Sequence, residues 1–452
     1  MSWTGAGVRA ALDLPAGAGP GRTFSGISTD TRTLGEGALF VALTGERFDG
    51  HAHLAEAAAR GAAAAVVRQG TPPVAGLELF EVPDTLAAFG WLARARRRAI
   101  SGPVVAVTGT NGKTSTKEML ALALGTRFRV HATRANLNNL VGVPQTILEA
   151  PADTEALVVE AGASVPGEIG RYRRIIEPTV SVVTNVSAGH LEGFGSLDGV
   201  LAEKLALVEG VGLAVVGTEP AALTTGARKL ARRVVTAGLD GAELRPESVT
   251  LDPGGRATVD VGSTRFTLPL PGRHLAANAM LAWAVAIHLG LDPRAVGRAL
   301  ERLVVPGGRG QVEQVGGLTI LNDCYNASPL SFRAAIATAQ AMRAGRRLVF
   351  VAGTMRELGT ESAALHAAVA ADLVALRPEL LAAVGEFVPV LDRHRPELGD
   401  RLLVADDVPA LGAALAGRLA GDELIVLKAS RGVALERIIP LLTPRAAHGP
   451  EA

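Results

Sequence analysis

The sequence predicts an α/β protein of three domains, and three observations lead to this prediction. Short apolar runs alternate with helical stretches along the chain, a pattern typical of parallel sheets covered by helices. The 452 residues are roughly three times the ~150 residues of a typical domain. The pattern also changes near residues 101–103 and again near residues 305–309. We therefore expect domains at residues 1–101, 102–306 and 307–452.

Composition excludes several classes of protein. The 45 Lys and Arg residues balance the 44 Asp and Glu residues, and a net charge of +1 offers no general attraction to nucleic acid or to an anionic membrane. The hydrophobic content of 48% excludes disorder over most of the chain. No segment approaches the ~20 apolar residues of a membrane span. The single cysteine, Cys324, excludes an internal disulfide and a cysteine-based zinc site. Because the first residues also lack the pattern of a signal peptide, we expect a cytoplasmic protein. We also expect a monomer.

The first domain is predicted to be a small α/β unit. In chain order we expect a strand, a polar turn, a helix and a second strand, at residues 38–43, 44–50, 53–60 and 64–68. A longer helix is expected at residues 84–100, with Asp84 as its N-cap. Arg94, Arg97 and Arg98 fall on one face of this helix, and we interpret that basic face as solvated.

The second and third domains are predicted from their buried-strand patterns. Continuous apolar runs, typical of buried parallel strands, lie in the second domain at residues 104–107, 157–160 and 180–184. Residues 245–270 alternate apolar and polar side chains between glycine turns, which indicates antiparallel hairpins. The third domain has a Rossmann-like pattern, with strands expected at residues 318–321, 347–351, 381–384, 402–404 and 424–427.

A glycine-bearing loop at residues 108–114, TGTNGKT, stands between a strand and a helix of the second domain. Backbone N–H groups of such a loop can approach phosphates closely, Lys113 can reach the β- and γ-phosphates, and the Thr114 hydroxyl can bind Mg²⁺. The strict G-x-x-x-x-G-K-[ST] pattern is not met, because residue 107 is valine. The alternative is a tight strand-to-helix turn. A chain with five lysines and 40 arginines uses lysine sparingly, which favours a specific role for Lys113.

Three further charged residues lie near strand ends of the second domain. Glu160 ends a buried strand, where open α/β sheets place their ligands and where an unpaired charge is costly. His190 follows the next strand, and alone it could be a metal ligand or an ordinary polar residue. Lys204 alone would read as a surface lysine of a helix, and Asp323 in the third domain could equally cap a helix.

These segments together resemble the Mur ligases, the ATP-dependent amide-forming enzymes of peptidoglycan synthesis. The resemblance rests on GTNGKTS, on Glu160 within VVEAGA, on HLEGFGS and on the downstream Lys204. Further segments follow in family order from about residue 25 to residue 440: STDTR, LFVALTGERFDGH, NLNN, GRH with Asn278, NDCYNASP and LKASR. Five positions in or beside these motifs depart from the usual family pattern, namely Gly189, Asn322, Ser328, Thr354 and Ala429.

The resemblance implies a three-domain architecture with distinct ligands. The N-terminal domain would bind a uridine nucleotide, the central P-loop domain would bind ATP on its parallel sheet, and the third would be Rossmann-like. ATP would contact Gly109, Thr110, Asn111, Gly112, Lys113, Thr114, Ser115, His274, Asn278, Arg309 and Asp323. Two Mg²⁺ ions would be held by Thr114, Glu160, His190 and Lys204, the last as a carbamate formed with CO₂. The substrates would contact Thr31, Arg32, Arg47, Asp49, Gly50, His51, Asn136, Asn138, Asn139, Tyr325, Asn326, Lys428, Ser430 and Arg431.

The implied reaction joins D-alanyl-D-alanine to a UDP-N-acetylmuramoyl-tripeptide through an acyl phosphate, with Lys113, Glu160, His190 and Lys204 as the catalytic group. A sibling enzyme that adds the third residue of the stem peptide is one alternative, although its D-N-P-[RA] motif is not found. A P-loop phosphotransferase or ATPase and a non-catalytic uridine-nucleotide module are the others.

Overall fold

The computed structural model describes residues 3–16, 21–46 and 48–442. The chain forms two compact units. One comprises Met1–Ala106, Phe128–Ala163 and Gly167–Val180, and the other comprises Val107–Arg127, Ser164–Pro166 and Ser181–Ala452. None of the helices in the described ranges combines the length and the apolar character needed to cross a membrane.

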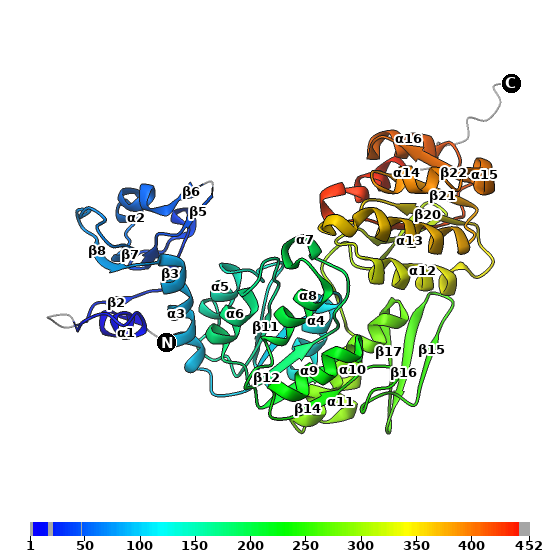
Figure 1. Cartoon of the computed structure of the whole chain (residues 1–452). Helices are drawn as coiled ribbons and strands as arrows, with labels where there is room; N and C mark the ends of the chain where they lie inside the picture. The colour runs from blue at the N-terminus through cyan, green and yellow to red at the C-terminus, as the bar shows by residue number, and fades with distance from the viewer. Residues whose placement is uncertain (1–2, 17–20, 47, 443–452) are drawn as a thin grey trace. The chain divides into compact units, whose positions relative to one another are not determined.

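The N-terminal part of the first unit is built on a small parallel sheet (Figure 1). Its strands lie in the order β3-β4-β7-β8, at Ile27–Ser28, Leu39–Val41, Ala64–Arg68 and Glu78–Val82. Two short antiparallel pairs accompany it, β1 with β2 (Trp3–Thr4, Thr23–Phe24) and β5 with β6 (Thr44–Gly45, Phe48–Asp49). The helices are α1, α2 and α3, at Gly5–Ala11, Leu54–Ala59 and Thr85–Arg98. The predicted strands and helices are confirmed. The elements β1, α1, β2, β3 and β8 were not predicted, and the expected turn at residues 44–50 contains the short pair β5 and β6.

Helix α3 begins where the sequence predicts, because the Asp84 carboxylate accepts hydrogen bonds from the N–H groups of Leu86 (2.8 Å) and Ala87 (3.1 Å). Its basic face, however, is not merely solvated. Arg97 donates to the main-chain oxygens of Ile176 (2.6 Å) and Glu177 (2.7 Å), at the end of α6 (Glu168–Ile176). The solvated interpretation is therefore wrong for Arg97, which satisfies carbonyls that the end of a helix leaves without partners.

The Glu177 side chain completes this junction. Arg94 and Arg98 both donate to its carboxylate, each with a contact of 2.7 Å. The hydrogen bond from Arg98, assisted by that from Arg94, lowers the pKa of Glu177 from 4.5 to about 2. The α3–α6 junction in the first unit is thus partly ionic and partly a helix cap.

Replacing Glu177 by glutamine is expected to lower stability at neutral pH and to have little effect in acid. The variant loses the charge of a partly exposed pair, a loss of about 1 kcal/mol or about 2 °C in Tm. Since the folded state has the lower pKa, this stabilisation is present above pH 4.5 and is lost as the pH falls towards about 2. Melting temperatures of wild type and variant, measured from about pH 7 to about pH 2.5, should therefore converge. A pH-independent difference would contradict the ionic contribution, and Glu36→Gln, at an exposed position, is the control.

The central sheet has the strand order β10-β11-β9-β12-β13-β14. These strands lie, in that order, at Val130–Ala132, Ala156–Glu160, Val104–Thr108, Val180–Val183, Leu213–Val216 and Val234–Thr236. Its helices are α4 to α9, at Lys113–Leu124, Gly142–Leu148, Glu168–Ile176, Leu191–Phe194, Leu197–Leu205 and Ala221–Leu230. The predicted strands are confirmed, and the strands β9, β11 and β12 are fully buried, as their apolar runs indicate.

The predicted hairpins form a three-stranded antiparallel sheet, β15-β16-β17, at Ser248–Leu251, Arg256–Val261 and Thr264–Pro271. Two helices follow it, α10 at Arg273–His288 and α11 at Pro293–Leu300. Helix α10 packs against α4, the helix that follows the phosphate loop. The hairpin sheet is therefore an addition to the second unit and not part of its parallel sheet.

The third sheet has the order β18-β19-β23-β20-β21-β22. Its strands lie, in chain order from β18 to β23, at Gln311–Val315, Leu318–Asp323, Leu348–Ala352, Leu380–Val384, Leu402–Ala405 and Leu424–Lys428. Strand β18 is antiparallel to β19, and the other pairs are parallel. The last strand, β23, thus lies between β19 and β20, in the interior of the sheet.

Helices around this sheet enclose its core. They are α12 to α16, at Pro329–Arg343, Ser362–Ala375, Phe387–Asp392, Arg395–Leu398 and Val408–Ala416. Phe332, Phe350 and Phe387 pack together beneath them, with the rings of Phe332 and Phe387 5.1 Å apart. The predicted Rossmann-like pattern is confirmed. Because β19, β20 and β23 are parallel neighbours, the loops that follow them share one edge of the sheet.

Candidate active site

The phosphate loop joins β9 to α4, and two of its glycines are required by close approaches. Gly109 has φ +142°, and a Cβ there would lie 2.0 Å from Oγ1 of Thr184. Gly112 has φ +78°, and its Cβ would lie 2.6 Å from Oδ1 of Asn278. Any side chain at either position would displace the loop from its neighbours. The glycine spacing therefore reflects packing against the residues that follow β12 and against helix α10.

Polar side chains after β12 hold this loop in place. The N–H of Asn111 donates to Oδ1 of Asn185 (3.1 Å), and its carbonyl accepts from Oγ1 of Thr184 (2.6 Å). The Asn111 amide donates to Oγ of Ser187 (3.0 Å), while the Ser187 N–H donates to Oγ1 of Thr110 (3.1 Å). Sequence reasoning missed these partners, although their position directly after a buried strand was a usable signal.

Lys113 is the first residue of α4, and its side chain turns back over the loop. Its Nζ donates to the main-chain oxygens of Gly109 (2.9 Å) and Thr110 (3.0 Å). Thr114 and Ser115 are buried in the first turn of the same helix. The first turn of a 12-residue helix, with a lysine held above it, is suited to binding phosphate groups.

Glu160, at the end of β11, is a buried carboxylate that is only half satisfied. The side chain is 2% exposed, and Oε1 accepts a hydrogen bond from the amide of Asn138 (2.8 Å). Among the described residues, Oε2 has no hydrogen-bond partner although it is buried. A buried and unpaired carboxylate oxygen is costly in the absence of a cation. This arrangement fits a metal ligand, and oxygen is the donor that Mg²⁺ prefers.

His190 and Lys204 belong to the second unit. His190 precedes helix α7 in the left-handed conformation (φ +55°), and its Nδ1 lies against the carboxylate of Glu357. This contact lowers the pKa of Glu357. Lys204, on α8, is 1% exposed, with Nζ 5.4 Å from the centre of the Phe194 ring.

No three His, Cys, Asp or Glu side chains in the described ranges gather closely enough to hold a metal ion by themselves. The implied ligands also include the Thr114 hydroxyl and a modified lysine, which lie outside that group of residue types. The unpaired oxygen of Glu160 is therefore the observation that fits a cation.

In the third domain, the buried Lys428 side chain has a structural role. It is 1% exposed, and its Nζ lies 2.8 Å from the Asp323 carboxylate, while it donates to the main-chain oxygens of Asp323 (3.1 Å) and Asn326 (2.6 Å). These contacts hold the turn after β19. Within this turn, Asn326 is exposed. The Tyr325 ring lies near two cations, with the guanidinium carbons of Arg309 and Arg431 3.4 Å and 5.1 Å from its centre.

Two further contacts lie beside the phosphate loop. Ser328 caps helix α12, and its hydroxyl donates to Oδ1 of Asn111 (2.9 Å). Asn278 is buried on α10 against Gly112, whereas His274 on the same helix is exposed. Residues expected to bind ATP therefore come from both the central and the third domain of the second unit.

Cys324 is buried, and burial raises the pKa of its thiol. The side chain packs with the apolar residues beneath the third sheet. It therefore contributes packing and not an activated thiolate.

The N-terminal residues form a separate polar cluster. Asp49 accepts from the N–H of His51 (3.0 Å), lies 2.6 Å from its Nδ1 and 3.2 Å from the Arg68 guanidinium. The hydrogen bond from the His51 N–H, with that from its ring, lowers the pKa of Asp49 from 3.8 to about 2. Gly50 allows the chain to pass the main-chain oxygen of Leu43, which a Cβ would approach to 2.9 Å.

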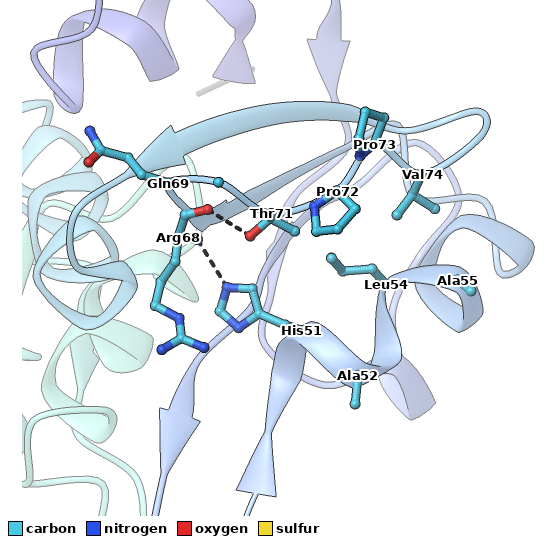
Figure 2. Close-up of a pocket in the computed structure, with 11 residues that line it drawn as sticks. His51, Ala52, Leu54, Ala55, Arg68, Gln69, Thr71, Pro72, Pro73 and Val74 are labelled. Carbon is cyan, nitrogen blue, oxygen red and sulfur yellow. Dashed lines mark hydrogen bonds between the residues drawn. The ribbon is translucent and has the colours of Figure 1, made fainter.

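A cavity of about 560 Å³ opens beside this cluster (Figure 2). Figure 2 shows His51 and Arg68 on one side of it and the Pro72–Val74 segment on the other. Nε2 of His51 accepts from the Arg68 N–H (3.0 Å), so the ring is anchored at both nitrogens. Two other residues expected to contact this substrate differ in exposure: Thr31 is buried, whereas Arg32 is exposed and forms an ion pair with Asp30 (2.6 Å). Arg47 lies outside the described residues.

The three asparagines near β10 differ in their surroundings. Asn138 holds Glu160, as described above, whereas Asn139 accepts from the N–H of Gly142 (2.8 Å) at the start of α5. Asn136 is exposed.

In the third domain, Ser430 is 3% exposed and its hydroxyl accepts from the N–H of Arg356 (2.9 Å). Asn139 and Ser430 thus have structural partners that sequence reasoning did not predict.

Comparison with known proteins places these features in a wider context. Three family models match the chain: "Mur ligase family, catalytic domain" at residues 23–97, "Mur ligase middle domain" at residues 107–286, and "Mur ligase, glutamate ligase domain" at residues 308–431. The UDP-N-acetylmuramoyl-tripeptide–D-alanyl-D-alanine ligase of Bacillus subtilis (strain 168) is 34% identical over 424 residues, which cover 92% of each chain. The enzyme of the same name from Escherichia coli (strain K12) is 35% identical, over 93% of this chain and 94% of that protein.

Solved structures agree with these matches. MurF from Acinetobacter baumannii superposes with a TM-score of 0.87 and 29% identity, covering 98% of this chain and 99% of that one. MurF from Thermotoga maritima in complex with ADP gives a TM-score of 0.82 and 28% identity, covering 92% and 97%.

Proposed function

Because the chain belongs to the Mur ligase family, we propose that it is the ATP-dependent ligase that joins D-alanyl-D-alanine to UDP-N-acetylmuramoyl-tripeptide. The observation that carries this proposal is the match, over more than nine-tenths of both chains, to ligases of that name. We assign the uridine-linked substrate to residues 1–101 and ATP mainly to residues 102–306. Residues 307–452 would bind the dipeptide and complete the ATP site. The enzyme acts in the cytoplasm, as a monomer.

The reaction proceeds in two steps. The γ-phosphoryl group of ATP passes to the terminal carboxylate of the tripeptide, which gives an acyl phosphate and ADP. The amine of D-alanyl-D-alanine then attacks the acyl carbon, the C–O bond to phosphate breaks, and the nitrogen loses a proton to form the amide. Charge accumulates on oxygen in both steps, so positioning and electrostatics dominate catalysis.

The chain's own groups fit these demands. Lys113 directs its ammonium over the loop that would hold the phosphates, and Asn111, fixed by Asn185 and Ser187, keeps that loop in shape. His274 and Asn278 contact the adenine side, and Arg309 and Asp323 reach the phosphates and ribose. Closure of the third domain over this region keeps water from the acyl phosphate.

Thr114, Glu160, His190 and a carbamate on Lys204 would hold Mg²⁺. The buried Oε2 of Glu160 supports this assignment, because it lacks another partner among the described residues. When bound, the metal would neutralise charge on phosphate oxygens. The uridine-linked substrate contacts Thr31, Arg32 and residues 47–51, and its peptide contacts Asn136, Asn138 and Asn139. Tyr325, Asn326, Ser430 and Arg431 face the dipeptide, while Lys428 acts by holding their turn.

Mass spectrometry of the product tests this function. Incubation with ATP, Mg²⁺, UDP-N-acetylmuramoyl-tripeptide and D-alanyl-D-alanine should give a product heavier than the tripeptide substrate by the dipeptide minus one water. Steady-state ADP release, beyond one equivalent of enzyme, should require both the tripeptide and the dipeptide. Equal ADP release with the dipeptide withheld would instead indicate an ATPase or a phosphotransferase. Addition of a single diamino acid to the UDP-linked dipeptide would indicate the sibling ligase.

A further inference from the structure

Two residues with unusual backbone conformations face each other in the second unit. His190 has φ +55° and Glu357 has φ +64°, although neither is glycine. Such conformations cost about 1–3 kcal/mol each and persist where the surrounding structure enforces them, often at functional sites. His190 precedes α7 in the central domain, whereas Glu357 follows β20 in the third domain. Their pairing therefore joins two domains at one side-chain contact.

The contact itself involves one particular ring nitrogen. The Glu357 carboxylate lies within ion-pair distance of Nδ1 of His190, and that nitrogen is buried. The two groups meet the distance of an ion pair without the angle of a well-formed hydrogen bond. This leaves Nε2 as the nitrogen available to a ligand. A histidine that binds a metal usually donates its other ring N–H to a carboxylate or carbonyl, which fixes its tautomer.

The main chain around Glu357 is seated on the helix that follows His190. The N–H of Glu192 donates to the main-chain oxygen of Glu357 (3.3 Å). Gly359 has φ +57°, and a Cβ there would lie 3.3 Å from Cα of Glu192. The close approach of these two backbones keeps the Glu357 side chain beside His190.

Contacts within the third domain also fix the two residues that precede Glu357. The N–H of Met355 donates to Nε2 of His366 (3.0 Å), and the N–H of Arg356 donates to Oγ of Ser430 (2.9 Å). His366 is fully buried, and its Nδ1 lies 2.8 Å from the main-chain oxygen of Ser362. The two residues before Glu357 are thus both fixed by side chains, which limits the positions that its carboxylate can reach.

We propose that Glu357 is a positioning residue for His190: its carboxylate beside Nδ1 favours the tautomer that carries the proton on that nitrogen, and so leaves Nε2 to bind Mg²⁺. This inference rests on the proposed function, because it takes His190 as a metal ligand. It assigns to the third domain a part in forming the metal site of the central domain. The His190 ring is held in the form that binds the ion only when residues 353–359 pack against α7.

Manganese binding tests the proposal without the ligation reaction. Mn²⁺ is titrated into the ADP-loaded full-length protein, and free Mn²⁺ is measured by electron paramagnetic resonance. Glu357→Ala should weaken Mn²⁺ binding about 10- to 100-fold, the usual effect of losing a carboxylate behind a metal-binding histidine. Glu357→Gln should lose less, because its amide oxygen still places a partial negative charge beside Nδ1. Glu361→Gln, an exposed position four residues further on, should bind Mn²⁺ as the wild type does.

The ring tautomer provides the second readout. Nitrogen NMR of protein labelled at histidine, with the His190 signals assigned from a His190→Gln variant, should show the proton on Nδ1 in the wild type. That preference should be lost in Glu357→Ala and retained in Glu357→Gln. Unchanged Mn²⁺ binding in Glu357→Ala would overturn the proposal. Weakened binding with an unchanged tautomer would overturn it too, since Glu357 would then bind the ion directly.

The two measurements also separate this inference from the proposed function. Neither requires the tripeptide or the dipeptide. A protein that shows both effects but makes no amide product would refute the proposed reaction and leave the positioning role in place. A protein that makes the product but shows neither effect would refute only the positioning role.

Discussion

Replacing Lys204 by arginine should reduce ligation as severely as replacing it by alanine, by about 100-fold or more. Lys204 is 1% exposed and its Nζ lies beside the Phe194 ring. A neutral amine can add CO₂ and release a proton to form a carbamate, whose oxygens suit Mg²⁺. A guanidinium stays charged and cannot take this path. Steady-state ADP release in the presence of all three substrates measures the loss.

The matched control is Lys229→Arg, which makes the same change at an exposed lysine of α9 and should leave the rate unchanged. Acetate should restore part of the activity of Lys204→Ala, because a small carboxylate can fill the vacated space. Activity of Lys204→Arg near that of the wild type would mean that Lys204 acts only as a positive charge. The carbamate assignment would then be abandoned.

Replacing Lys113 by arginine is expected to lower turnover by about 100-fold or more, the scale of a lost electrostatic donor. The Lys113 ammonium is a compact donor held by the main-chain oxygens of Gly109 (2.9 Å) and Thr110 (3.0 Å). A planar guanidinium keeps the charge but is too bulky for this loop. Because the loop is also closed in by Thr184 and Asn278 at its two glycines, it has little room to adjust.

Rapid-quench measurement of acyl phosphate formation would locate this defect. The loss should fall on phosphoryl transfer, while folding, followed by the melting temperature, should be unchanged. Turnover of Lys113→Arg close to that of the wild type would contradict the phosphate-loop assignment, whatever the other motifs imply.

Local features of the sequence predict most of the fold. Asp84 begins α3 as predicted, because an N-cap needs only its own side chain and the next N–H groups. The runs that became β9 and β12 are apolar throughout, so a buried parallel strand is the favoured interpretation. The short strands β3 and β10 were missed, since two or three residues carry too little pattern.

Contacts between segments that are distant in the chain were harder to predict from the sequence. Arg97 looks like an ordinary basic residue of a helix until the end of α6 is placed beside it. Lys428 reads equally well as a substrate contact, and only the register of β23 against β19 shows that it faces Asp323. Glu357 lies in a segment that the sequence singles out only for its Thr354, and its partner His190 is far away in the chain.

The place of β23 also affects how the protein is made. This strand, at residues 424–428, is among the last parts of the described chain to be synthesised, yet it separates β19 from β20. A nascent chain on the ribosome can complete the N-terminal sheet early, because domains generally fold as units in order of synthesis. The third sheet must wait, with the edges of β19 and β20 unpaired, until residue 428 has emerged. Premature termination before that point would therefore give a protein with intact N-terminal domains but no turn at Tyr325.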